Sequence, residues 1–102
     1  TIASGWYSHA EGYGAESTGE KSHAEGYQTE ATAEAAHSEG YKTEAKELAA
    51  HAEGLLAIAS GQVSHAEGNA TTASGDGSHA EGISQNPPAD SVYDLSKNEL
   101  VE

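Results

Sequence analysis

The sequence predicts an all-β fold, a β-solenoid whose turns are each 14 residues long. Histidine occurs at positions 9, 23, 37, 51, 65 and 79, so every interval between successive histidines is 14 residues. Around each histidine the chain repeats S-H-A-E-G or a close variant of it. A fixed period of this kind marks an array in which each copy buries its surface only against its neighbours. We therefore expect six stacked turns over residues 1–83.

Each 14-residue unit is expected to hold two strands. Fourteen residues are too few for two helices and a turn, but they suit two strands of about five residues joined by two tight turns. The first strand is S-H-A-E-G, and the second is a T-x-A-S-G echo, as in residues 71–75. Glycine ends both strands, and we expect it at the corners, where a tight turn needs a positive φ. The two sets are Gly12, Gly26, Gly40, Gly54, Gly68 and Gly82 for the first strand, and Gly5, Gly19, Gly61 and Gly75 for the second.

Strand alternation predicts a narrow interior made of small side chains. In S-H-A-E-G the Ser and Ala side chains share one face, while His and Glu share the other. The second strand adds Thr29, Thr43 and Thr71, together with Ala31, Ala45, Ala59 and Ala73. Hydroxyl groups inside the roll must bond to the backbone or to each other, because an unpaired buried hydroxyl costs about 1–3 kcal/mol.

Residues 28–59 are the part of the chain in which helix competes with strand, because they are rich in Ala, Glu and Lys. His37, Gly40, His51 and Gly54 nevertheless keep the 14-residue grid through this stretch. Tertiary context overrides helix propensities of a few tenths of a kcal/mol per residue. We therefore expect strands here too.

The composition excludes several classes of function. The formal net charge is −13, from four Lys plus Arg against 17 Asp plus Glu, so the basic clusters that bind nucleic acid or anionic lipid are missing. The sequence has no apolar stretch near the ~18 residues of a membrane span. Catalysis is also disfavoured, because every histidine has the same setting as its copies, whereas an active site is normally singular. We expect no enzyme activity and no cofactor.

The same composition predicts an oligomer. The apolar fraction of 35% is mostly Ala, and the sequence has no Cys, Met or Phe. A conventional core cannot be built from these residues, and disulfides cannot replace it. Association with other chains is the remaining route to stability.

The repeat resembles a known family, the head repeats of YadA-like trimeric autotransporter adhesins, whose 14-residue unit contains S-x-A-x-G and A-x-G half motifs. S-H-A-E-G is also similar to the H-A-E-G repeats of phage tail-fibre and prophage proteins. The likeness covers residues 1–83. It implies a left-handed parallel β-roll, a homotrimer around one axis, and a role in surface display and attachment. Where the adhesin heads commonly carry two aliphatic residues, this chain carries His and Glu.

Stacked turns place the histidines and the glutamates in two columns. Carboxylates about 4.8 Å apart repel by about 3.5 kcal/mol at an effective dielectric near 20, so a partner is needed in every turn. We expect a hydrogen-bonded ladder between subunits, in which ionised Glu accepts from His. Its residues are His9, Glu11, His23, Glu25, His37, Glu39, His51, Glu53, His65, Glu67, His79 and Glu81. The alternative is a metal-binding His-ladder solenoid that uses the same six histidines around a trimer axis. The plain ladder is favoured, because His-x-Glu alone has no closed ligand set.

Two further surfaces are expected outside the ladder. Tyr13, Tyr27 and Tyr41 follow the glycine in three successive turns and form a candidate glycan-binding strip; the simpler interpretation is an aromatic stack that packs between turns. Leu48, Leu55, Leu56 and Ile58 fall at corner or outward positions, which is typical of a subunit contact. Trp6 and Tyr7 are expected to cover an open end or to contact a preceding domain.

The grid ends at Ile83, so residues 84–102 are expected to form a Pro-containing linker or neck that leads to another module. Pro87 and Pro88 prevent a further turn. The chain begins at Thr1 without an initiator Met or a signal segment, and we interpret it as a fragment or a processed piece. The expected function is a structural and attachment segment of a trimeric surface fibre, located outside the cell on a virion tail fibre or a bacterial surface. Its partners would be two further copies and a host receptor or glycan.

Overall fold

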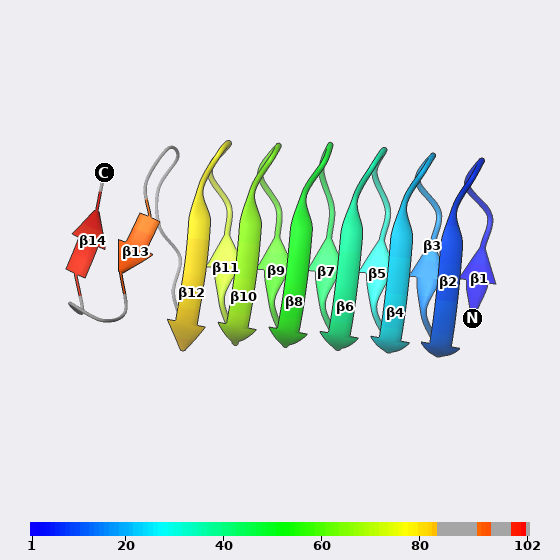
Figure 1. Ribbon diagram of the computed structural model, residues 1–102, viewed down its shortest axis with the longest axis horizontal. Coiled ribbons are helices and arrows are strands. Elements are labelled where there is room, and N and C mark those ends of the chain that lie inside the picture. Colours follow the sequence, from blue (N-terminus) through cyan, green and yellow to red (C-terminus); the bar gives the residue numbers. More distant parts are fainter. Residues whose placement is uncertain (84–91, 95–98, 102) are drawn as a thin grey trace.

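The computed structural model describes residues 1–83, 92–94 and 99–101. Within these residues the chain forms strands and turns but no helix. The six turns stack in a row, and each turn gives one strand to each of two facing sheets (Figure 1). The β-solenoid with 14-residue turns is therefore confirmed.

The two sheets differ in strand length. The short strands form a six-stranded sheet in the order β1-β3-β5-β7-β9-β11. They are β1 (Ile2–Ala3), β3 (Glu16–Ser17), β5 (Glu30–Ala31), β7 (Glu44–Ala45), β9 (Ile58–Ala59) and β11 (Thr72–Ala73). The long strands belong to an eight-stranded sheet in the order β14-β13-β12-β10-β8-β6-β4-β2. They are β2 (His9–Tyr13), β4 (His23–Tyr27), β6 (His37–Tyr41), β8 (His51–Leu55), β10 (His65–Asn69) and β12 (His79–Ile83).

The register of the strands is set by the repeat. Every pairing among the turns is parallel and joins residues 14 apart, as in His37 opposite His51 and Glu39 opposite Glu53. The stretch at 28–59, where helix competed, forms β5 to β9 in this same register, so the strand prediction is confirmed.

The sheet of long strands continues beyond the repeats. β13 (Val92–Asp94) pairs parallel with β12 through His79 and Val92, and antiparallel with β14 (Glu99–Val101). These two strands fall within the linker or neck predicted at residues 84–102, of which residues 84–91, 95–98 and 102 lie outside the described residues.

The interior is as narrow as the alternation predicts. Twelve alanines form the buried hydrophobic cluster, and the buried polar side chains are all Ser or Thr. Several hydroxyls pair across the interior, as in Ser38 Oγ to Thr43 Oγ1 at 2.7 Å and Ser17 Oγ to Ser22 Oγ at 2.6 Å. Others donate to turn carbonyls, as Ser64 does to Gly61 O at 2.6 Å. Small side chains thus allow the two sheets to lie close together.

The prediction that every buried hydroxyl finds a protein partner is wrong for two threonines. Thr29 Oγ1 and Thr71 Oγ1 are buried without a hydrogen-bond partner among the described residues. Thr43 bonds to Ser38, five residues earlier, and the corresponding positions before Thr29 and Thr71 are Ala24 and Ala66. Alanine at this position removes the side-chain partner. Thr43 also donates to Glu39 O at 3.0 Å, and among the described residues Thr29 and Thr71 make no such bond.

The second strand of each turn is shorter than predicted, with two residues instead of about five. Gly75, predicted to end the second strand, begins a tight turn in which Ser78 N–H donates to Gly75 O at 3.1 Å. The same turn joins Ser22 to Gly19 and Ser64 to Gly61. The turn thus takes residues that alternation alone would assign to the strand.

The predicted positive φ is confirmed for all six glycines of the first strands, from Gly12 to Gly82, although each lies one residue before the end of its strand. The prediction is wrong for the second-strand glycines Gly5, Gly19, Gly61 and Gly75, which do not have a positive φ. The left-handed corners lie elsewhere in the turn. The corner positions have φ near +55° and mostly carry other residues, with Gly14 and Gly77 as the glycines among them. The non-glycine corners are Tyr7, Lys21, Gln28, Ala35, Lys42, Ala49, Leu56, Val63 and Ala70. Glycine is required instead inside the long strands: at Gly40, with φ +113°, an added Cβ would lie 2.1 Å from Gly54 O. Close approach between turns, more than the corner, selects glycine in this fold.

Candidate functional site: the His–Glu ladder

The outer face of the long strands carries the two columns that the repeat predicts. We call the set His9 to His79 and Glu11 to Glu81, at 14-residue spacing, the His–Glu ladder. From His23 onward the imidazole rings stack nearly parallel, with centroids 4.5–4.7 Å apart and interplanar angles of 2–8°. The ring of His9 is tilted by 33° from that of His23. The regular backbone register therefore extends to the side chains.

Histidine and glutamate meet within each turn of a single chain. The distance from His Nε2 to the Oε2 of the Glu two residues later is 3.5–3.8 Å in all six turns. Contacts between turns occur as well, because His65 Nε2 lies 3.5 Å from Glu53 Oε1 and His79 Nε2 lies 3.3 Å from Glu67 Oε1. Each ladder carboxylate therefore has a His partner on its own strand, independently of any contact with a second chain.

Most of these contacts are longer than a good hydrogen bond. Among the described residues, the pair His79 and Glu67 is within hydrogen-bond geometry. Nε2 of His23, His37, His51 and His65 is closed off from solvent and has no hydrogen-bond partner in the part of the chain that the structure describes. Four nitrogen atoms therefore face carboxylates at 3.5–3.7 Å with their bonding capacity unused.

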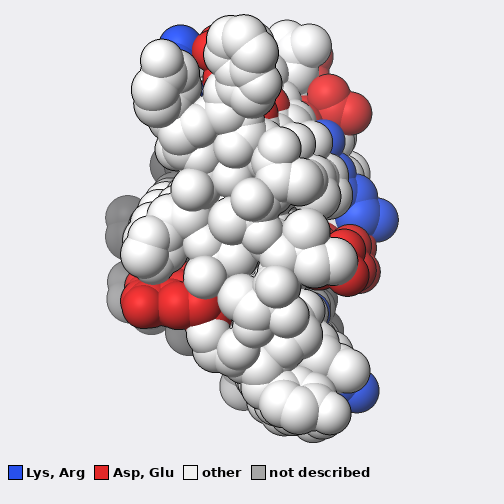
Figure 2. All heavy atoms as spheres, turned by 90° about the vertical axis from the view of Figure 1, so that its right-hand side faces the viewer, with Lys and Arg blue, Asp and Glu red and all other residues white. Residues whose placement is uncertain are grey.

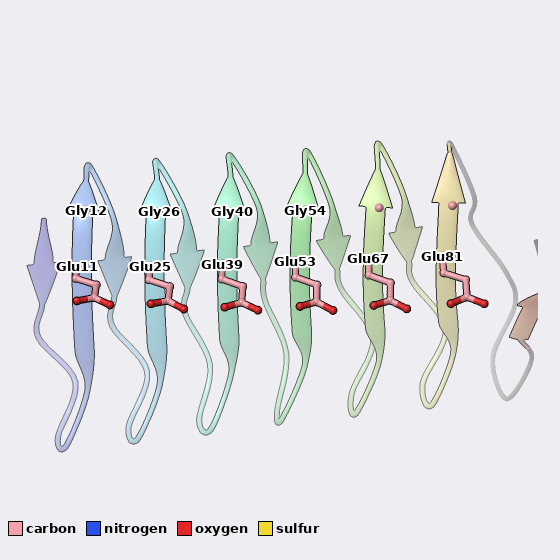
Figure 3. Close-up of a pocket in the computed structure, with 12 residues that line it drawn as sticks. Glu11, Gly12, Glu25, Gly26, Glu39, Gly40, Glu53, Gly54, Glu67 and Glu81 are labelled. Carbon is pink, nitrogen blue, oxygen red and sulfur yellow. The ribbon is translucent and has the colours of Figure 1, made fainter.

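A groove follows the ladder along the stack. Its volume is about 1080 Å³, and it is lined by the Glu column and by the glycine that follows each Glu. Figure 3 shows the six Glu side chains parallel to one another, one from each long strand, with the glycines next along the strand. Because glycine has no side chain, the floor of the groove is backbone, and a partner can approach it closely.

The ladder brings together donor sets that can hold a metal ion. In five consecutive places a His, the Glu two residues later and the His of the next turn have ligand atoms within 4.8 Å of one another. The metal sets expected from the sequence were His-x-Glu alone and three histidines around an axis, and neither includes the second imidazole that the next turn supplies. The 14-residue spacing itself was the signal that could have found it.

The tyrosine strip is stacked and exposed. Tyr13 and Tyr27 have ring centroids 5.1 Å apart, and Tyr27 and Tyr41 are 4.8 Å apart, both nearly parallel. All three tyrosines remain exposed to solvent. Lys42 Nζ lies 5.6 Å from the centre of the Tyr41 ring. Leu55 continues the same column, so an apolar surface runs along this edge of the sheet.

The apolar side chains expected on the outside are there. Leu48, Leu55 and Leu56 are exposed, and Ile58 is half-buried on the outer face of β9. Trp6 is 75% exposed, so among the described residues nothing covers it.

A second acidic column lies on the short strands. Glu16, Glu30 and Glu44 are paired in register, and together with Gly14, Gln28 and Lys42 they line a smaller hollow. Lys46 Nζ lies 2.8 Å from Glu44 Oε2, and the hydrogen bond and charge of Glu44 raise the pKa of Lys46 above its ordinary value. Figure 2, which looks along the stack, shows carboxylates on opposite sides of the molecule, with one row that has no Lys or Arg beside it.

Among the described residues, no helix has the length and apolar character needed to cross a membrane. Comparison of the chain with known protein families, curated proteins and solved structures finds no match in any of the three.

Proposed function

We propose that this chain is a structural and attachment segment of a trimeric surface fibre, a phage tail fibre or a cell-surface adhesin. In this proposal three parallel solenoids associate along their length and hold a receptor-binding part at a distance. The segment has no catalytic role and needs no cofactor for this task.

The observation that carries the proposal is the difference between the two sheets. The long-strand face presents His, Glu and Gly in all six turns, beside a groove with a backbone floor. The outward column of the short strands varies, from Glu16, Glu30 and Glu44 to Ile58 and Thr72. A face that is identical in every turn suits a partner with the same period, and a second copy of this chain has that period.

The composition of the core supports association as well. The largest fully buried side chains are threonines, so each turn buries little apolar area. At about 25 cal/mol per Å² of apolar area, such an interior gives one chain a small margin over the cost of ordering it. The exposed leucines at 48, 55 and 56 provide the additional area that neighbouring chains would cover.

Size-exclusion chromatography with light scattering tests the proposal. The expected mass is three times the 10.4 kDa of one chain, independent of loading concentration over a wide range. A folded species with the mass of one chain at high concentration would refute the trimer.

The attachment role is assigned to the exposed tyrosine strip, because stacked aromatic faces are suitable platforms for sugar rings. Binding to immobilised glycans should fall at least about tenfold when Tyr27 and Tyr41 are both replaced by Ala, a loss of about 1.4 kcal/mol. Replacing Ile2 and Val63, which are exposed elsewhere and lie outside the proposed subunit contact, is the matched control. Equal binding by both double variants would remove the strip from the proposal.

A further inference from the structure

We propose that the His–Glu ladder is a metal-binding array that takes divalent transition ions such as Zn²⁺, Ni²⁺ and Co²⁺. Each ion is held by two imidazoles from successive turns and by the Glu carboxylate of the earlier turn, whose ligand atoms lie within 4.8 Å of one another. The inference rests on contacts within one chain, so it does not depend on the proposed trimer.

The spacing of the first two donors already suits a metal ion. Metal–nitrogen and metal–oxygen bonds to Zn²⁺ are about 2.0–2.2 Å long, so two ligand atoms on a tetrahedral ion lie roughly 3.4 Å apart. The distance from His Nε2 to Glu Oε2 within each turn is 3.5–3.8 Å. An ion between these atoms would also use the Nε2 atoms that have no hydrogen-bond partner.

The third donor comes from the next turn. In the triad of His51, Glu53 and His65, the two Nε2 atoms lie 3.7 and 3.5 Å from opposite oxygens of the same carboxylate. In the triad of His65, Glu67 and His79, the corresponding distances are 3.6 and 3.3 Å. These side chains are about one-third exposed, so the parallel rings can rotate toward a shared ion. The groove beside the Glu column leaves a fourth position for water.

The repeat limits the number of ions. An imidazole Nε2 has one lone pair, so each His can ligate one ion through this atom. Six histidines in a row therefore form at most three separate triads. These are His9-Glu11-His23, His37-Glu39-His51 and His65-Glu67-His79. Ions placed this way are two strand spacings apart, roughly 9–10 Å, and repel about half as strongly as ions in adjacent turns.

The donor chemistry sets the selectivity. Imidazole with one carboxylate suits Zn²⁺, Co²⁺ and Ni²⁺, whereas Ca²⁺ and Mg²⁺ prefer six or more oxygen ligands. The like-charged Glu column also favours bound cations, in a chain with a formal net charge of −13. Each bound ion would join two turns, so metal should stabilise the stack along its axis.

Calorimetric titration of the untagged, chelator-treated protein tests the inference. With ZnCl₂ we expect about three ions per chain and a rise in the thermal unfolding midpoint, and with CaCl₂ we expect neither. The d–d absorption of a Co²⁺ probe should report a tetrahedral nitrogen and oxygen site. Equal binding of Ca²⁺ and Zn²⁺ would overturn the proposal, because it would mean that the carboxylates alone attract cations.

Two double variants that each lose two histidines distinguish shared triads from independent sites. His37→Ala with His51→Ala removes one triad and leaves two, so about two ions should bind. His23→Ala with His37→Ala leaves His9 isolated and three consecutive histidines, so about one ion should bind. Equal stoichiometry for the two variants, or about six ions for the unchanged chain, would refute ligation by successive turns.

The controls separate loss of a site from loss of the fold and from failure of the fibre proposal. Glu30→Gln with Glu44→Gln removes two carboxylates from the other sheet and should leave three ions bound. Circular dichroism of each variant checks that it keeps its strands, and His9→Ala with His23→Ala provides a pair in the first turns, where His9 is the more exposed. Light scattering in chelator measures the trimer separately, so a monomer that binds three Zn²⁺ ions would refute the fibre and support the array.

Discussion

At the residue scale, the glycine that follows each ladder Glu is the position that tolerates least change. It has φ between +106° and +116°, and in the five turns from Gly12 to Gly68 the backbone of the next turn occupies the place of its missing Cβ. Neither the backbone conformation nor the space admits another residue. This glycine therefore recurs because neighbouring turns lie too close together for a side chain at that position.

Replacing Gly40 by Ala should therefore destabilise the fold by roughly 3 kcal/mol, since the new Cβ would lie 2.1 Å from Gly54 O at an unfavourable φ. The matched control is Gly14→Ala, at a corner with φ +69°, where the nearest atom is the flexible Gln28 Cγ at 3.2 Å. Equivalent corners carry Gln28 and Lys42, so this change should cost about 1 kcal/mol or less. Urea unfolding of both variants measures the difference, and equal losses would contradict the close-approach explanation.

The buried threonines give a second prediction at this scale. Thr43→Val should destabilise the protein by about 1–2 kcal/mol, because it leaves Ser38 Oγ without its partner at 2.7 Å. Thr29→Val, an identical change at a buried position without a partner, should be neutral or stabilising. Denaturant midpoints of the two variants check the sign, and a larger loss for Thr29→Val would show that its hydroxyl has a partner after all.

At the scale of the elements, the carboxylates of the two sheets differ in the residues that they contact. Each ladder Glu contacts a His, whereas Glu30 lies between Glu16 and Glu44 in register and only Glu44 is paired with a Lys. The long-strand sheet therefore repeats one His–Glu contact in every turn, whereas the short-strand sheet does not repeat a contact for its Glu column.

Two double variants with equal change in net charge test this difference. Glu39→Gln with Glu53→Gln should lower the stability of the proposed trimer by roughly 2 kcal/mol per chain, because both residues face the groove and contact His. Glu30→Gln with Glu44→Gln should change it by about 0.5 kcal/mol or less, since both residues lie on the short-strand sheet and the ion pair of Glu44 is to a half-exposed Lys46, which solvent and salt screen. Denaturant-induced dissociation followed by light scattering measures both, and a reversed order would place the interface on the short strands.

The Lys46–Glu44 pair predicts a pH dependence for the short-strand sheet. The hydrogen bond and the charge of Glu44 raise the pKa of Lys46 above 10.5 in the folded chain. Its contribution to stability is therefore fully present below pH 10.5 and is lost as the pH rises through the higher folded value. Lys46→Met should remove this part of the alkaline decline in thermal midpoint. An unchanged alkaline profile in the variant would show that the pair contributes nothing.

At the scale of the whole molecule, the solenoid should tolerate the loss of a complete turn but not of half a turn. Deleting residues 47–60 joins Lys46 to Gly61 and preserves the register, so a five-turn stack should fold cooperatively with a lower unfolding midpoint. Deleting residues 47–53 removes seven residues and reverses which side chains face inward. Circular dichroism melts should show a cooperative transition for the first deletion and none for the second.

Four features could be predicted from the sequence: the stack, its 14-residue period, the small-residue interior and the two columns of the ladder. These predictions were possible because residues one period apart lie over one another in a parallel array, and the six histidines occur at that period without a gap. Alternation then assigned the inner and outer faces, as the buried Ala52 beside the half-exposed His51 and Glu53 shows.

Three features could be seen only in the three-dimensional structure: where the turns begin, why glycine is needed and which atoms meet in the ladder. A four-residue turn shortens the second strand, and the backbone of the next turn lies too close to Gly40 to leave room for a side chain. Strand alternation predicts neither of these features. The sequence placed His65 next to Glu67 in one turn, but the packing of turns placed it beside Glu53 as well. Local periodicity reports which face a residue occupies, whereas distances between neighbouring turns depend on backbone packing in three dimensions.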